Sequence, residues 1–488
     1  MFTQIKKAGL KDAAISRRLG QGFLCLILVG LMGSGEAAPM VKEVNGVARV
    51  FGDGEKVSEV ILTYSEPLLA SSVSPKDYVL SKGTLESVQV ARSLPPFKAA
   101  EEGRYVILKV KTENTVPETL LAAPQKERTE KMRQEPKLDG HSDRKAPDLS
   151  IAVRQVGEVT GAKGDKSPGS IQFMASTRTL EPDLSRFTQK VFTDPETGIS
   201  LPYSLYLPKK IKQGEKLPLV YFGVDMSGNN DDFTTPLYQG NGATIWTDPA
   251  FQAKHPSIVV APQYTSELVT KLGMLTADDH QWTKGLTLLK HFLDYAVKTY
   301  PVDPNRIYGT GQSQGGMANI AISDRYPDFF AAQYLVACQW DPKKMQVLKD
   351  KPLWITVCEG DNKAYPAMNE TTALWEKADV KVARNATLWD STLPVGTLNA
   401  KMEQLLQPDT HIYYTVFKGG NQCTRGALPI PMMPSGSGSF HRQKKSKTLG
   451  ISKKGKVCTE IKLPLTKQYE SGMILRNYSS RVTEGMAP

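Results

Sequence analysis

Residues 306–316 read Arg-Ile-Tyr-Gly-Thr-Gly-Gln-Ser-Gln-Gly-Gly, and this stretch decides the fold. Its start predicts a β-strand, and the residues that follow it as far as Asp324 predict a helix. Between the two lies Gly311-x-Ser313-x-Gly315, the pattern of a serine on a sharp turn from strand to helix. Side chains at the flanking glycines would collide with that turn. The pattern predicts Ser313 as a nucleophile, with a serine in an ordinary structural turn as the alternative.

The sequence around this motif predicts a mostly parallel sheet with helices on both faces. From about residue 180, short apolar runs alternate with helical patterns. One amphipathic helix carries its apolar residues on one face between Leu286 and Val297. The fold class predicted is therefore α/β, of the α/β-hydrolase type. The expected strands are 217–222, 258–261, 306–309, 331–337, 353–357 and 412–417.

A serine hydroxyl becomes an effective nucleophile when a histidine accepts its proton and an acid orients that histidine. In this fold the three residues follow one another in the order serine, acid, histidine. Asp361 follows the strand expected at 353–357 and is the predicted acid, with Glu359 as the second choice. A solvated acid in a surface turn is the alternative.

The candidate base comes from the histidines downstream of the acid, which are His411 and His441. His411 opens the strand expected at 412–417, at the end of the sheet opposite the catalytic edge. His441 lies in a loop after that strand, behind the small-residue run 435–439, and is the predicted base. The alternatives are a surface histidine in a tail and an incomplete triad.

Two backbone amides are expected to stabilise the oxyanion. The amide of Gln314 begins the helix after the nucleophile, where amides point toward the site. The second donor is expected in the loop 223–230, near Asp225 or Met226, although Asp225 also suits a helix cap. Trp340, on a loop after a neighbouring strand, either lines the substrate pocket or belongs to the core. No metal-ligand spacing or phosphate-binding glycine loop occurs, so no metal or cofactor is expected.

The strand content of region 40–175 predicts a small β-sandwich of the immunoglobulin-like type in front of the hydrolase domain. A charged, proline-containing insertion near 113–148 is expected to form a long surface loop. Two stretches alternate as half-buried strands do. Each places three apolar residues on one face: Val60, Leu62 and Tyr64 in the first, and Val106, Leu108 and Val110 in the second.

Residues 1–37 have the parts of an export signal peptide. A basic leader precedes the apolar run 23–32, and Gly35 and Ala37 stand at the −3 and −1 positions of a signal-peptidase site. The apolar run is too short to span a bilayer comfortably, so no stable membrane anchor is expected. The protein is therefore expected to be secreted or periplasmic.

The charge is concentrated near the end of the chain. The net charge is +11, and the stretch 442–456 alone holds seven basic residues and no acid. This favours a solvated basic tail over 442–488, after a catalytic domain at 180–441, rather than a nucleic-acid-binding surface. Four cysteines remain without the leader, and they predict either two disulfides or buried thiols: Cys338, Cys358, Cys423 and Cys458.

Several further blocks, in order along the chain, are similar to one known group. The chain resembles exported predicted peptidases and polyhydroxybutyrate-depolymerase-like esterases, in which an immunoglobulin-like module precedes an α/β-hydrolase domain. The resemblance implies Ser313 and Asp361 as triad members and an esterase-like activity outside the cytoplasm. The blocks lie at 236–243, 252–256, 261–264, 305–316, 339–341, 359–361 and 364–366.

Two features depart from this group. Many relatives have a His-Gly pair in the first oxyanion loop, where this chain has Val224-Asp225. Relatives also follow the catalytic histidine with an aromatic-rich helix, whereas a polar, basic segment follows His441. Without such a helix an apolar sheet face would be exposed, so we expect either poor stability or a substitute packing element.

The sequence thus predicts a serine hydrolase acting on small-molecule or polymeric esters, or on peptides, through an acyl-enzyme on Ser313. A non-catalytic exported protein is the alternative. In that case the β module would bind a polymer or glycan, and the hydrolase scaffold would have lost its activity.

Overall fold

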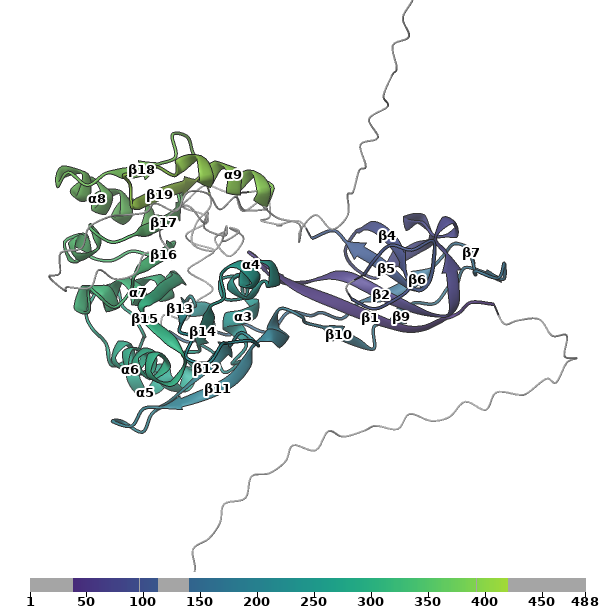
Figure 1. Ribbon diagram of the computed structural model, residues 1–488, viewed down its shortest axis with the longest axis horizontal. Coiled ribbons are helices and arrows are strands. Elements are labelled where there is room, and N and C mark those ends of the chain that lie inside the picture. Colours follow the sequence, from purple (N-terminus) through teal and green to yellow (C-terminus); the bar gives the residue numbers. More distant parts are fainter. Residues whose placement is uncertain (1–37, 96, 113–139, 392, 420–488) are drawn as a thin grey trace, which may run out of the picture.

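The computed structural model describes residues 38–95, 97–112, 140–391 and 393–419, and Figure 1 shows the path of the chain. The expected signal peptide, most of the charged insertion, His441 and the basic tail lie outside the described residues. The described residues form a β-rich N-terminal module and a larger domain built on a nine-stranded sheet. Within these ranges, no helix has the length and apolar character needed to cross a membrane.

The N-terminal module is a β-sandwich. A five-stranded sheet has the order β10-β1-β2-β5-β4, a three-stranded sheet has the order β3-β6-β9, and β7 pairs with β8. One hydrophobic core joins the first two sheets, because it contains Val60 and Val106 from the larger sheet and Tyr78 and Val153 from the smaller. The strands are β1 (Val41–Phe51), β2 (Gly54–Leu69), β3 (Tyr78–Leu80), β4 (Leu85–Ala91), β5 (Glu102–Val110), β6 (Ala152–Gln155), β7 (Val159–Thr160), β8 (Lys166–Ser167), β9 (Met174–Ala175) and β10 (Arg178–Leu180).

All six apolar residues that the alternation placed on inward faces of β2 and β5 belong to this core. The predicted β-sandwich in front of the hydrolase domain is therefore confirmed. The alternation works here because every second residue of each strand faces this core, although Ile61 and Ile107 on the opposite face are buried as well.

The larger domain is organised around a mostly parallel sheet of order β11-β12-β14-β13-β15-β16-β17-β19-β18. Strands β11, β12 and β14 pair in antiparallel fashion, and the other pairs are parallel. The strands are β11 (Thr188–Thr193), β12 (Ser200–Tyr206), β13 (Leu217–Gly223), β14 (Ile258–Pro262), β15 (Val302–Gln312), β16 (Ala332–Val336), β17 (Leu353–Cys358), β18 (Val382–Arg384) and β19 (Ile412–Phe417).

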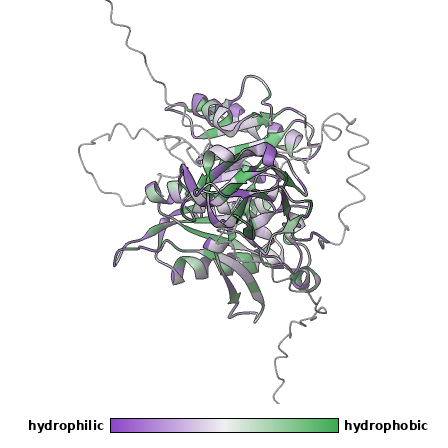
Figure 2. Ribbon diagram, turned by 90° about the vertical axis from the view of Figure 1, so that its right-hand side faces the viewer, coloured by the Kyte–Doolittle hydropathy of each residue, from purple (hydrophilic) through white to green (hydrophobic). Residues whose placement is uncertain are grey.

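Helices cover both faces of this sheet, as predicted. Buried residues of α6, α7 and α8 share one hydrophobic cluster, and buried residues of α3 and α9 share another. Figure 2 shows the hydrophobic residues mainly along the strands and inner helix faces, with hydrophilic residues along the outer loops. The helices are α3 (Thr235–Tyr238), α4 (Pro249–Lys254), α5 (Ser266–Leu272), α6 (Lys284–Thr299), α7 (Gln314–Arg325), α8 (Ala364–Lys377) and α9 (Val395–Leu405).

Helix α9 provides a packing element at the β17–β19 side of the sheet. Its buried residues Leu398 and Met402 belong to the same cluster as Trp354 of β17 and Tyr413 and Phe417 of β19. The rings of Trp354 and Tyr413 stack with centroids 4.8 Å apart. In the described part of the chain, this face therefore carries a helix that the sequence did not predict.

The two parts meet at the tip of the β1–β2 hairpin, which reaches toward the larger domain (Figure 1). A Cβ atom on Gly54, in the turn, would lie 3.4 Å from the carbonyl oxygen of Tyr238 in α3. Asp183, just after β10, accepts hydrogen bonds from the Arg49 side chain at 2.9 Å and from the Val50 amide at 3.0 Å. These contacts fix the end of the sandwich against the start of the hydrolase domain.

Candidate active site

Ser313 stands on a strained turn between β15 and α7. Its backbone torsions are φ 50° and ψ −119°, and it caps the N-terminus of α7 without a side-chain capping hydrogen bond. A positive φ is unfavourable for a residue with a Cβ atom and persists where the surrounding structure imposes it. The strand, turn and helix predicted from 306–324 are all present, and they give Ser313 the backbone of a nucleophile elbow.

The two glycines that flank Ser313 allow close backbone contact. A Cβ atom on Gly315 would lie 2.0 Å from the carbonyl oxygen of Gly223, at the end of β13. A Cβ atom on Gly311 would lie 2.5 Å from the carbonyl carbon of Gly315. Because no side chain fits at either position, the start of α7 lies directly against the end of β13. The loop that follows β13 therefore begins beside the nucleophile helix.

Asn319, on α7, forms hydrogen bonds to the backbone on both sides of Ser313, and it was not identified from the sequence. Its side chain is fully buried, and its amide nitrogen donates to the carbonyl oxygens of Thr310, at 3.0 Å, and Gly315, at 2.8 Å. One side chain thus connects the strand before Ser313 to the helix after it. The sequence feature that could have indicated its role is a single asparagine among the small and apolar residues of the expected helix.

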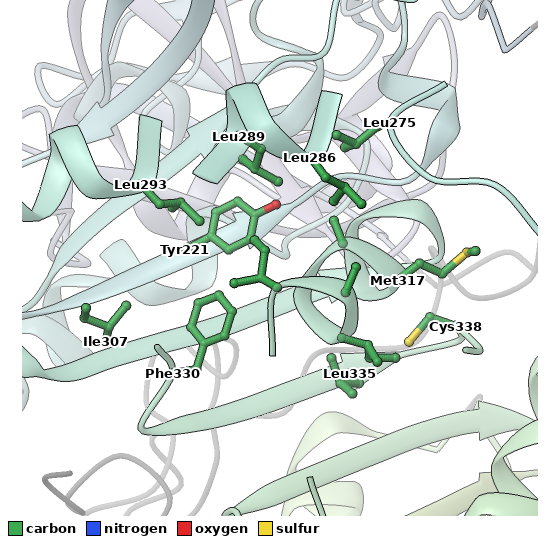
Figure 3. Packing of buried hydrophobic residues seen from close by; sticks show 14 of the residues in the cluster. Tyr221, Leu275, Leu286, Leu289, Leu293, Ile307, Met317, Phe330, Leu335 and Cys338 are labelled. Atoms are coloured by element: carbon green, nitrogen blue, oxygen red, sulfur yellow. The ribbon is translucent and has the colours of Figure 1, made fainter. Parts of the chain in front are cut away.

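Beneath the elbow, α7 packs on an apolar layer (Figure 3). Met317 of α7 and Cys338, just after β16, belong to the same cluster as Leu335. A Cβ atom on Gly316 would lie 2.5 Å from the Cys338 sulfur, so this layer is tightly packed. Cys338 and Cys358 are both buried, and they belong to two different hydrophobic clusters.

Asp361 lies in the turn after β17, as predicted. Its side chain is buried, with 3% of the residue exposed. Its Oδ1 atom accepts hydrogen bonds from the backbone amides of Lys363, at 3.1 Å, and Ala364, at 3.0 Å. Glu359 is exposed, and its Oε2 atom accepts from the amide of Gly419. Burial and fixed orientation favour Asp361 over Glu359 as the acid.

Ser313 and Asp361 lie at the same edge of the sheet. Each follows the carboxyl end of a parallel strand, and β16 separates β15 from β17 in the strand order. Adjacent strands are about 4.8 Å apart, so two strand positions span about 10 Å. A histidine side chain that forms a hydrogen bond to the serine on one side and to the acid on the other can bridge strands at this spacing.

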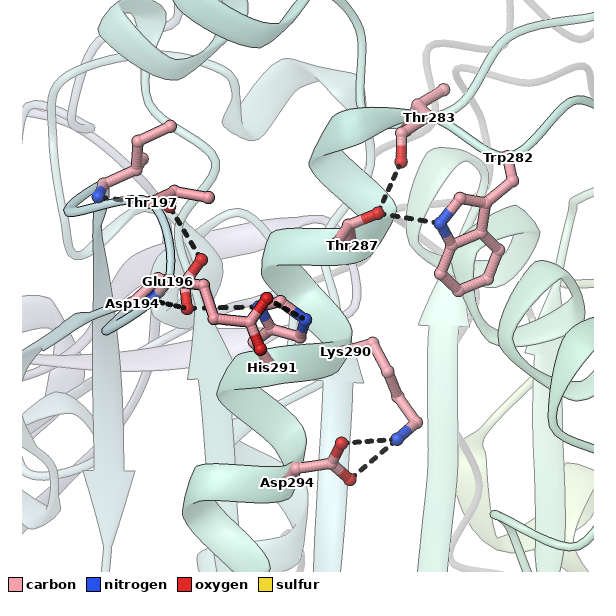
Figure 4. A network of polar contacts seen from close by, with 10 residues as sticks. Asp194, Glu196, Thr197, Trp282, Thr283, Thr287, Lys290, His291 and Asp294 are labelled. Carbon is pink, nitrogen blue, oxygen red and sulfur yellow. Dashed lines mark hydrogen bonds and ion pairs between the residues drawn. The ribbon is translucent and has the colours of Figure 1, made fainter.

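Five of the six histidines are described, and two of them have well-defined roles far from this edge. His411, at the amino end of β19, donates from Nε2 to the carbonyl oxygen of Lys349 at 2.8 Å, as expected for a residue at the opposite end of the sheet. His291 of α6 contacts Asp194, Nδ1 to Oδ1, at 3.1 Å (Figure 4). His441, the predicted base, lies outside the described residues.

The contact between His291 and Asp194 is a hydrogen bond with a structural role. Burial raises the pKa of Asp194, but hydrogen bonds from Thr197 and His291 outweigh burial and leave the pKa below its usual value. The same helix carries an ion pair between Lys290 and Asp294 (Figure 4). The His291–Asp194 contact joins α6 to the turn after β11, whereas the Lys290–Asp294 pair lies within α6.

The predicted oxyanion residues lie on two adjoining segments. Gln314 is the first residue of α7, where the backbone amides have no partner within the helix and point out of its N-terminus. Asp225 and Met226 lie in the loop after β13, and Met226 begins the short 3₁₀ helix Met226–Gly228. The Asp225 carboxylate accepts from the Ser227 amide at 2.8 Å, so its side chain acts as the cap that was the alternative. A backbone donor in this loop stays a prediction.

Trp340 is a core residue with 2% of its surface exposed. Its ring lies 4.9 Å from that of His280, centroid to centroid. The core interpretation thus has direct support, and a role in the substrate pocket stays a prediction. Within the described ranges, no group of three or more His, Cys, Asp or Glu residues is arranged to hold a metal ion.

Comparison with known proteins agrees with this architecture. Residues 43–168 match the family model of the esterase Ig-like N-terminal domain. The structure is similar to the crystal structure of a thermostable esterase, with a TM-score of 0.57 and 22% sequence identity. That similarity covers 78% of this chain and 92% of the esterase chain, so it extends over both parts. The sequence matches no curated protein.

Weaker similarities link the chain to a ferulic acid esterase and to an acylaminoacyl peptidase from Pyrococcus horikoshii. The first has a TM-score of 0.35 and 14% identity over 49% of this chain and 92% of that chain. The second has a TM-score of 0.36 and 12% identity over 63% of this chain and 50% of that chain.

The nine-stranded sheet, the serine elbow and the match to the esterase together define an α/β-hydrolase-fold protein. Its N-terminal module matches the family model of the esterase Ig-like N-terminal domain, and the two parts together share the overall fold of the thermostable esterase. The predicted combination of an immunoglobulin-like module with an α/β-hydrolase domain is therefore confirmed.

Proposed function

We propose that the protein is a secreted serine hydrolase that cleaves ester bonds through an acyl-enzyme on Ser313. The observation that carries this proposal is the strained backbone of Ser313, at φ 50°, between a parallel strand and a helix. Strain of this kind is retained where function requires it. The buried Asp361 at the end of β17 supplies a second member of a triad at the same sheet edge.

In the proposed reaction, the Ser313 hydroxyl attacks the ester carbonyl and His441 accepts its proton. Asp361 orients His441 and stabilises the imidazolium that forms. The amide of Gln314 and one amide from the loop at Asp225 and Met226 hold the oxyanion. His441 then donates the proton to the departing alcohol. Water, deprotonated by His441, attacks the acyl-enzyme, and the acid is released with Ser313 restored.

We propose small-molecule or polymeric esters as substrates, with peptides as the second class that the same chemistry serves. The export signal at 1–37 would place the enzyme outside the cytoplasm. The proposed division has an immunoglobulin-like module at 40–175, a catalytic domain at 180–441 and a basic tail at 442–488. This layout supports the proposal because a separate β module can present the catalytic domain to an external substrate.

The test is hydrolysis of a short-chain nitrophenyl ester by the chain from Ala38 onward, beside the Ser313→Ala variant. A peptide panel with the same two proteins separates the substrate classes. Ester turnover that disappears in Ser313→Ala supports the proposal, and His441→Ala then tests the base. A folded wild-type protein that hydrolyses neither class would contradict it and would favour a non-catalytic polymer- or glycan-binding protein.

A further inference from the structure

Asn229 links the loop after β13 to the residue that follows the nucleophile. The side-chain Nε2 of Gln314 donates to Asn229 Oδ1 at 2.9 Å, and the side-chain Nδ2 of Asn229 donates to Gln314 Oε1 at 3.2 Å. Both side chains are buried, with 0% of Asn229 and 4% of Gln314 exposed. This reciprocal pair joins the two segments on which the oxyanion donors are expected.

Asn229 also forms hydrogen bonds with residues 140 and 142, which lie before the hydrolase domain in the chain. Its amide nitrogen donates to the carbonyl oxygen of Gly140 at 2.9 Å. The backbone carbonyl oxygen of Asn229 accepts from the backbone amide of Ser142, also at 2.9 Å. Gly140 and Ser142 precede β6 in the chain, so they belong to the sequence of the N-terminal module. Asn229 therefore contacts both the nucleophile helix and a segment of the module in front of it.

Residues 140–144, here called the docking segment, lie on the hydrolase domain. Gly140 is buried and has φ 84°, and a Cβ atom there would lie 2.9 Å from the Met274 side chain. Arg144 donates from Nη1 to the Ser227 hydroxyl at 2.9 Å. Ser227 follows Met226 in the loop after β13. The docking segment thus contacts this loop at two points, Asn229 and Ser227.

The position of this loop matters for catalysis in the mechanism above. Oxyanion donors act when they lie about 2.7–3.1 Å from the developing negative charge, and losing one donor lowers kcat by about 10²–10³-fold. Removing the Asn229 side chain would leave the buried side-chain amide of Gln314 and the backbone carbonyl of Gly140 without the hydrogen bonds that Asn229 makes to them. Unpaired buried groups are unfavourable, so the loop would shift to find new partners.

We propose that Asn229 is a positioning residue that aligns the oxyanion loop with the Gln314 amide, and that the docking segment holds Asn229 in place. The N-terminal module therefore contributes to the geometry of the active site. This inference rests on the proposed function, because alignment of an oxyanion hole affects rate only in acyl transfer.

The kinetic test uses Asn229→Ala in the chain from Ala38 onward. We expect kcat for the nitrophenyl ester to fall about 10–100-fold while KM changes less than about threefold, because a misaligned donor weakens transition-state binding more than substrate binding. An unchanged kcat in a folded variant overturns the proposal. A rise in KM at constant kcat also overturns it, since that result indicates a role in substrate binding.

A second variant reaches the same contact from the module side. Gly140→Ala adds a methyl group against Met274 at a positive φ and leaves the Asn229–Gln314 pair chemically intact. We expect kcat to fall, and the double variant to be no slower than Asn229→Ala alone, because both changes act through one contact. The matched control is Gly164→Ala, which also has a positive φ but has no atom within 4 Å of the added Cβ. Additive losses in the double variant contradict the proposal.

Hydrogen exchange separates failure of this proposal from failure of the proposed function. The Ser142 amide donates to the backbone carbonyl oxygen of Asn229, which both variants retain. We expect this amide to exchange at least about tenfold faster in Asn229→Ala and Gly140→Ala than in the wild type, because loss or displacement of the adjacent contact between the Asn229 side chain and Gly140 frees the docking segment to open locally. This readout needs no catalysis. If the wild type is inactive but shows the expected exchange pattern, the proposed hydrolase function is refuted and the proposed contact between the docking segment and Asn229 is supported. Unchanged exchange in both variants refutes the docking, whatever the activity.

Discussion

At the level of single residues, Ser313 and its neighbours determine the geometry of the candidate site. The glycine pattern around Ser313 was sufficient to predict the elbow, because close backbone contact excludes every other residue type there. The position of Asp361 in the turn after β17 was also predictable, and its role as the acid stays a prediction. Asn229 and Asn319 were not predicted. Their roles depend on hydrogen bonds between segments far apart in the sequence, which no local pattern records.

The strained backbone of Ser313 predicts a difference between two inactive variants. Glycine adopts a positive φ without steric strain, whereas alanine keeps that strain. We expect Ser313→Gly to be more stable than Ser313→Ala by about 1 kcal/mol, after subtraction of the greater entropy that glycine gives the unfolded chain. Urea unfolding of both variants measures the difference. Equal midpoints, or a less stable glycine variant, would show that the turn stores no strain.

At the element scale, the sequence predicted the parallel strands better than the sheet edges. Strands β13 to β17 and β19 are buried on both faces and appear in the sequence as short apolar runs. Strand β11 is mostly exposed and β18 has three residues, so neither forms such a run. Helix α9 contains Gly396 and has no side-chain cap, and these features weaken its helical pattern.

Helix α9 is expected to contribute strongly to stability because it covers one face of the sheet. Leu398→Ala would remove a buried side chain beside Trp354 and Tyr413, and buried Leu→Ala changes destabilise by about 2–5 kcal/mol. Gln404→Ala, on the exposed side of the same helix, is the matched control, with an expected change below about 0.5 kcal/mol. Thermal and urea unfolding provide the comparison. A similar effect of both substitutions would mean that α9 does not support the sheet.

At the scale of the whole molecule, the N-terminal module and the hydrolase domain are joined through two sets of contacts. One set lies at the β1–β2 hairpin tip and the other at the docking segment. Sequence patterns predicted that both parts exist, because each part has its own core with its own periodicity. The contacts between them were not predicted, since they involve scattered polar residues such as Arg49, Asp183 and Arg144.

Glu55, beside the hairpin tip, makes stability depend on pH. Burial first, and then the carboxylates of Glu181 and Asp183, raise the pKa of Glu55 from 4.5 to about 8. The folded protein therefore retains a proton that the unfolded chain has lost between these two values. Because the unfolded state binds fewer protons over this range, the free energy of unfolding falls as pH rises from about 4.5 to about 8.

Replacing this acid by its neutral analogue is expected to remove that dependence. Glu55→Gln should be more stable than the wild type by roughly 2–4 kcal/mol at pH 8, and the two should differ little at pH 5. Urea unfolding across this pH range measures the difference, with Glu86→Gln, an exposed acid, as the control. A constant difference between wild type and Glu55→Gln at all pH values would show that Glu55 does not hold the extra proton.

The central claim is that Ser313 is an activated nucleophile. The most direct measurement is covalent labelling of the folded chain by a fluorophosphonate probe, with the modified residue located by peptide mass spectrometry. We expect one phosphonylated residue, Ser313, and no labelling of Ser313→Ala or of unfolded wild-type protein. A folded wild-type protein that remains unlabelled, or that is labelled at another serine, would contradict the claim.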